Sequence, residues 1–180
     1  MAAVFPFTLD HALALIRLVV GLLLAGHGAQ KLFGWWGGPG LRGMAGWLGS
    51  MGLPAPWALA LFVALCEFLG GLAFALGLLT PLAALAITAV MLGAIGIVHW
   101  AHGLWVTNHG FEYPLVILAT AVAIGLAGPG VYALDAALKL PLPQQPVYLL
   151  GVALEVLGLL GLLALRRPQA ASRPAGAAAT

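Results

Sequence analysis

The chain has 180 residues, of which 63% are hydrophobic and only 7% are charged, and its mean hydropathy is +1.08. A water-soluble domain covers its surface with about 25% charged residues, so this composition excludes a soluble globular protein and makes lipid the solvent. The net charge of +2 comes without a basic patch large enough to bind nucleic acid. The single cysteine, Cys66, excludes an internal disulfide and a Cys-x-x-Cys redox pair.

Five apolar segments are long enough to be membrane helices, which need about 20 mostly apolar residues each. Asp10 is the expected N-cap of the first segment, Thr80-Pro81 separates the second from the third, and Pro114 suits the first turn of the fourth. In chain order the five segments cover about residues 10–33, 55–79, 82–101, 112–128 and 147–165.

Three connections between these segments have distinctive compositions. Residues 34–54 are rich in Gly and Trp and are expected to form a loop at the membrane interface. The stretch HWAHGLWVTNHGFEYP is a short polar and aromatic loop, in which Gly103 ends the preceding helix at His102. VYALDAALKL has apolar residues at helical spacing and an Asp135/Lys139 pair, so we expect a helix lying along the interface.

These elements predict an all-α integral membrane protein. Residues 10–140 form a transmembrane bundle of four helices, 147–165 form an additional C-terminal transmembrane helix, and 166–180 form a disordered tail rich in Arg, Ala and Pro. Lys and Arg are more frequent on the side that holds the first loop, the third loop and the C-terminus. The positive-inside rule therefore predicts that the C-terminus is cytoplasmic.

Polar side chains gather where three apolar segments reach the same membrane face. His27 and Lys31 are four residues apart, so they share a helix face near the end of the first segment. His99 ends the third segment and Glu112 begins the fourth, and antiparallel threading brings these ends together. The cluster is either a defined pocket or an interfacial rim, where such residues are common.

Three ionisable residues lie inside the apolar segments, where charge is costly and indicates function. Glu67 is near the middle of the second segment, and Arg17 in the first could reach it. The pair is either an ion pair that holds two helices together or a carboxylate that binds ligand or protons. Glu155 lies at the centre of the fifth segment. It faces either Arg17 or a partner subunit, or it is a neutral glutamic acid that bonds a backbone carbonyl.

The spacing of the histidines makes a metal site another hypothesis. His99 and His102, like His109 and Glu112, are three residues apart, and zinc or iron takes such ligands. No His-Glu-x-x-His motif is present, so we assign no metal ligand and expect neither metal nor haem.

With these residues placed, the chain resembles the DoxX family of integral membrane proteins. The similar stretches occur in the family's order over about residues 12–138: Arg17, GHGAQKLFGWWGGPG, LGSMGLP, CEFLGGLAFALGLLTPLAAL, IVHWAHG, NHGFEYPLV and GPGVYALD. The resemblance implies a four-helix membrane core and a redox setting, since the family is associated with a thiosulfate:quinone oxidoreductase and with thiol redox homeostasis. The family's characteristic polar residues correspond to Arg17, His27, Gln30, Lys31, Glu67, His99, Glu112 and Asp135.

The resulting hypothesis is a redox-associated membrane subunit of the prokaryotic plasma membrane that binds a quinone or a similar small molecule. Glu67 and His99 are the candidate catalytic residues, and the candidate ligand-binding residues are Arg17, His27, Gln30, Lys31 and Glu112. The chain has no recognisable electron carrier, so a soluble redox partner or a diffusible electron donor is expected, and the chain could form a homo-oligomer. The alternatives are a non-catalytic scaffold that recruits soluble redox enzymes and a small-molecule transporter.

Overall fold

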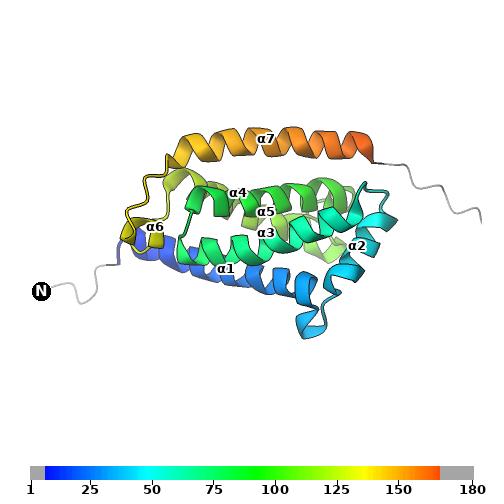
Figure 1. Cartoon of the computed structure of the whole chain (residues 1–180), viewed down its shortest axis with the longest axis horizontal. Coiled ribbons are helices and arrows are strands. Elements are labelled where there is room, and N and C mark those ends of the chain that lie inside the picture. Colours follow the sequence, from blue (N-terminus) through cyan, green and yellow to red (C-terminus); the bar gives the residue numbers. More distant parts are fainter. Residues whose placement is uncertain (1–6, 167–180) are drawn as a thin grey trace, which may run out of the picture.

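The computed structural model describes residues 7–166, and every regular element in that range is a helix (Figure 1). Two short helices, α2 (Gly40–Ser50) and α6 (Leu134–Ala137), lie at opposite ends of the longer ones (Figure 1). The longer helices are α1 (Leu9–Phe33), α3 (Pro56–Leu76), α4 (Thr80–Gly93), α5 (Glu112–Ala127) and α7 (Gln144–Leu165).

Four of these helices are long and apolar enough to cross a membrane. They are α1, α3, α7 and the 23-residue helix Thr80–His102, in which α4 continues through a π-helical segment, Ala94–His99, and a 3₁₀ turn, Trp100–His102. The fifth, α5, has 16 residues and is therefore about 24 Å long, slightly less than the hydrocarbon thickness. The predicted all-α membrane architecture is confirmed, including the additional C-terminal helix, which begins at Gln144.

Glycines let α1 and α3 pack closely in antiparallel orientation. A Cβ atom on Gly21 would overlap Gly71 and Ala75 of α3, and one on Gly28 would overlap the backbone of Phe68. Small residues permit such close helix contact in lipid, where packing rather than hydrophobic burial drives association. This contact sets the register of the two helices, with Gly28 level with Phe68.

Helix α7 packs on α4 and α5 through its N-terminal half. Tyr148 is its one fully buried residue, and the tyrosine hydroxyl lies 2.9 Å from Oγ1 of Thr88 on α4. Gly125 of α5 lies directly against the Tyr148 ring, where a Cβ atom would not fit. Near its C-terminal end, the Arg166 side chain donates to the Met51 carbonyl at 3.0 Å. These contacts fix both ends of α7 against the bundle.

Three local predictions were wrong. The segment predicted as a loop over 34–54 contains α2, because Met44, Ala45 and Leu48 lie at helical spacing and pack against Ala60 of α3. The predicted N-cap role of Asp10 belongs to Thr8, and Asp10 instead accepts a hydrogen bond from the Val131 backbone at 3.0 Å.

The predicted interfacial helix over VYALDAALKL is also wrong, because only Leu134–Ala137 is helical. Asp135 does not pair with Lys139. Its carboxylate is buried and caps the N-terminus of α4, and Lys139 adopts a positive φ of 51° that ends the helix. The division into a bundle and an additional helix stays a prediction, and the predicted tail lies outside the described residues except for Arg166.

Candidate functional site

A cavity of about 530 Å³ lies between α1, α2, α3, α4, α5 and α7. Most of its wall is apolar and includes Trp47, Leu48, Phe62 and Ile97. Its polar lining comes from four long helices and the π-helical segment: His27, Lys31, Glu67, His99, Tyr113 and Glu155. Ligand sites combine apolar walls with a few placed polar groups in this way, and their volumes are commonly about 300–1,000 Å³.

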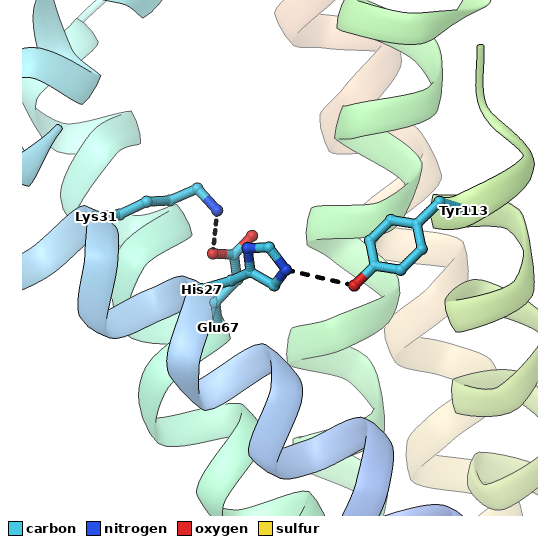
Figure 2. Close-up of polar contacts among 4 residues, drawn as sticks. All are labelled: His27, Lys31, Glu67 and Tyr113. Atoms are coloured by element: carbon cyan, nitrogen blue, oxygen red, sulfur yellow. Dashed lines mark hydrogen bonds and ion pairs between the residues drawn. The ribbon is translucent and has the colours of Figure 1, made fainter. Parts of the chain in front are cut away.

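Lys31 and Glu67 form an ion pair at the polar end of the cavity (Figure 2). Side chains on a helix lean toward its N-terminus. Lys31 stands near the C-terminal end of α1, so its side chain reaches back into the membrane, while Glu67 on the antiparallel α3 leans toward Lys31. The carboxylate side chain is 6% exposed and the lysine side chain is 21% exposed, so the pair buries both charges without a net charge.

Tyr113 completes the polar end of the cavity from α5. Its hydroxyl lies 3.4 Å from Nε2 of His27, which stands one turn before Lys31 on α1 (Figure 2). The sequence hypothesis named Glu112 and missed Tyr113. Adjacent residues on a helix point about 100° apart, so only one of the two can face the cavity, but the sequence alone does not reveal which one.

The π-helical segment Ala94–His99 forms part of the wall and carries His99 into the lining. Nδ1 of His99 lies 2.6 Å from the His109 carbonyl oxygen, which fixes the imidazole ring in place. Single π-helical turns inside α-helices occur frequently at functional sites. This segment is therefore a second structural indication that the cavity is functional.

Three predicted ligand-binding residues lie outside the cavity lining, namely Arg17, Gln30 and Glu112. Glu112 accepts a hydrogen bond from the Val106 backbone at 3.0 Å and so holds the loop before α5. Gln30 lies on α1 where Gly38 packs closely against its backbone and Cβ atom. The structure thus brings His27, Lys31, Glu67 and His99 together and separates Gln30 and Glu112 from them.

The predicted Arg17–Glu67 pair is wrong. Arg17 is buried near the other end of α1, where Nη2 donates to the Tyr132 carbonyl at 2.7 Å. Since Gly28 is level with Phe68, Glu67 is level with Ala29, and Arg17 lies about 18 Å from that depth along the helix axis. The arginine side chain also leans toward the N-terminus of α1, which is away from Glu67.

Arg17 belongs instead to a polar cluster around Asp135, here named the Asp135 cluster. One oxygen of Asp135 accepts from the Leu79 backbone at 2.7 Å, and the other accepts from Thr80 N at 2.7 Å and Thr80 Oγ1 at 2.6 Å. The Asp135 carboxylate also attracts the Arg17 guanidinium. The cluster ties α6 and α1 to the start of α4.

The histidines with metal-like spacing are engaged elsewhere. His102 Nδ1 lies 3.2 Å from the Val98 carbonyl oxygen, and the His102 and His109 rings are 6.4 Å apart. Among residues 7–166, no group of three His, Cys, Asp or Glu side chains is gathered to bind a metal ion.

The comparison with protein families decides the resemblance. Residues 12–100 match the model of the DoxX family. The chain therefore resembles the DoxX family over these residues, which are just under half of its length. The matched residues include Arg17, His27, Lys31, Glu67 and His99. The similar stretches beyond Trp100, and helix α7, lie outside the matched residues.

One curated relative of this chain is named "Putative oxidoreductase CatD" and comes from Bacillus subtilis (strain 168). The two chains are 29% identical over 121 residues, which is 67% of this chain and 82% of the relative. No solved structure matches the chain.

Proposed function

We propose that this protein binds a quinone, or a similar small molecule with ring carbonyl groups, in the 530 Å³ cavity and serves as the membrane component of an oxidoreductase system. The observation that carries the proposal is the meeting of an apolar cavity with a buried Lys–Glu pair, a histidine and a tyrosine at one end. The oxidoreductase name of the relative supports a redox setting.

The polar end of the cavity has the groups that a quinone carbonyl needs. An ammonium group has three N–H donors, so Lys31 can hold Glu67 and still donate to a ligand oxygen. His27 and Tyr113 lie beside this pair and add further donors. The apolar side chains around them would hold the ring and exclude water.

Reduction of a quinone to a quinol consumes two electrons and two protons. We assign proton delivery to Glu67, which is hydrogen-bonded to Lys31, and to His99, whose ring is held by the His109 carbonyl. In this proposal the electrons come from a soluble redox partner. We do not extend ligand contact to Arg17, Gln30 or Glu112, which lie outside the cavity lining.

Calorimetric titration of the purified protein with a short-chain benzoquinone tests this function. We expect saturable binding to the wild type and an affinity at least about tenfold weaker in Glu67→Gln and His99→Ala, about 1.4 kcal/mol each. His102→Ala is the matched control, because His102 is three residues from His99 but does not line the cavity. Equal binding by Glu67→Gln, His99→Ala and wild type would refute the assignment of these residues.

The scaffold and transporter hypotheses predict different results in the same experiments. A scaffold would bind no benzoquinone, and its activity would depend on exposed residues such as Trp36 and Trp105. A transporter would bind a solute and would also accumulate it in proteoliposomes.

A further inference from the structure

Glu155 is a cavity-lining carboxyl group that the proposed chemistry leaves unused. It comes from α7, which lies outside the residues that match the family. Its Oε2 atom is buried and has no hydrogen-bond partner among residues 7–166. Buried oxygens are nearly always hydrogen-bonded, because an unpaired one is a free-energy cost. Glu155 also lines the cavity, so its unpaired oxygen is a candidate acceptor for a hydrogen bond from a ligand.

Glu155 and the Lys31 group approach the cavity from different sides. Helices α1 and α7 lie on opposite sides of the bundle (Figure 1), so Lys31 and Glu155 enter the cavity from separate walls. Glu67 on α3 and Glu155 on α7 both line this cavity.

The position of Glu155 is fixed by the packing of α7. One end of the helix is held by Tyr148 on Thr88, and the other by Arg166 on Met51. Gly151 packs directly against Leu85, which brings α7 close to α4 one turn before Glu155. The backbone that carries Glu155 is therefore already ordered when a ligand binds, which lowers the free-energy cost of binding.

We propose that Glu155 is a second polar anchor of the cavity and accepts a hydrogen bond from a ring hydroxyl on the ligand edge opposite the one held by Lys31. This inference rests on the proposed function and makes its ligand class narrower: a quinol, or another ring molecule with polar groups on two opposite edges. The ionised Glu155 carboxylate accepts from a ring hydroxyl, whereas a quinone carbonyl offers it no proton. In this ionised form the site discriminates the hydroxyl-bearing form of the ligand from the carbonyl form.

The test measures affinity for a benzoquinone, for its hydroquinone and for the hydroquinone dimethyl ether under argon. We expect Glu155→Leu to weaken hydroquinone binding about tenfold and to leave binding of the quinone and the dimethyl ether unchanged. Glu155→Gln, whose amide oxygen still accepts, should retain hydroquinone affinity within about threefold. Thr120→Val is the control, since that hydroxyl bonds the Val116 carbonyl of its own helix and lies outside the cavity lining.

Thermal unfolding of the same variants separates ligand binding from a structural role. Removing an unpaired buried oxygen should leave the Tm of Glu155→Leu equal to or above that of the wild type, while the hydroquinone-induced rise in Tm shrinks. Should Glu155→Leu fold in low yield, Glu155→Met, which is closer in length to glutamate, replaces it.

The outcomes distinguish this inference from the proposed function. Wild-type hydroquinone affinity in Glu155→Leu, together with weak quinone binding in Glu67→Gln, overturns the role of Glu155 and leaves the function standing. A fall in Tm without a change in ligand affinity also overturns it and makes Glu155 structural. A wild-type protein that binds none of the three ligands overturns both.

Discussion

The two ends of this membrane protein contain polar clusters that are built differently. In the Asp135 cluster, both carboxylate oxygens accept hydrogen bonds from the start of α4, and Gly77 packs so closely on the Arg17 guanidinium that no other side chain fits there. At the other end, Lys31 and Glu67 pair beside a cavity of about 530 Å³. Polar groups buried in lipid can therefore serve two purposes: those that fill their surroundings stabilise the fold, and those that border a cavity can bind a ligand.

The largest expected effect comes from removing Asp135. Asp135→Ala takes three hydrogen bonds from the α4 N-terminus and leaves the Arg17 charge uncompensated. We expect a loss of about 3–5 kcal/mol in the free energy of unfolding, the usual cost of an unpaired buried charge, measured by unfolding in detergent. The benzoquinone affinity of the folded protein should not change.

Asp10→Asn is the matched control, because Asp10 makes a single exposed hydrogen bond at the same end of the molecule, to Val131. Its effect on stability should be well below that of Asp135→Ala. A large change in benzoquinone affinity in Asp135→Ala, at unchanged stability, would contradict the division between a structural end and a binding end.

At the cavity, substitutions of Lys31 and Glu67 likewise allow stability to be compared with benzoquinone affinity. Lys31→Met leaves the Glu67 carboxylate without a partner, and we expect it to lower the free energy of unfolding by about 2–3 kcal/mol. This is less than the cost of breaking a fully buried ion pair, because part of the lysine side chain is exposed. The double variant Lys31→Met/Glu67→Met should recover most of this stability, since no lone charge remains. It should not recover benzoquinone affinity, measured by calorimetry.

Recovery of stability without recovery of benzoquinone affinity is the result that shows a binding role for the pair. A double variant with wild-type affinity would show that the pair only holds α1 against α3. A double variant less stable than either single variant would show that the pair contributes more by attraction than it costs by burial.

The sequence predicts which residues are polar and at which depth they lie, but not the direction of every side chain. Hydropathy located all five long helices, because a continuous apolar segment is sufficient evidence for each of them. The predicted Arg17–Glu67 pair is wrong because Arg17 lies far from the depth of Glu67 and its side chain leans further away, toward the N-terminus of α1. The same lean brings the Lys31 and Glu67 side chains together, because α1 and α3 are antiparallel.

Other parts of the site depend on contacts far apart in the sequence. Asp135 caps α4 from 55 residues away, and nothing local distinguishes this role from a helical pair with Lys139. Glu155 enters the cavity because Tyr148 and glycines seat α7 on α4 and α5, and helix periodicity does not show which neighbour a helix will have.

The smallest expected effect tests the edge of the cavity with two adjacent residues. Tyr113→Phe removes a hydroxyl that lies 3.4 Å from His27, a long hydrogen bond, so we expect a threefold to tenfold loss of benzoquinone affinity, about 1 kcal/mol, with little change in Tm. Glu112→Gln should leave the affinity within about twofold, because its carboxylate holds the Val106 backbone outside the cavity. Calorimetric titration measures the benzoquinone affinity of both variants. The reverse order of effects would place the ligand in the loop before α5 instead of between α1 and α7.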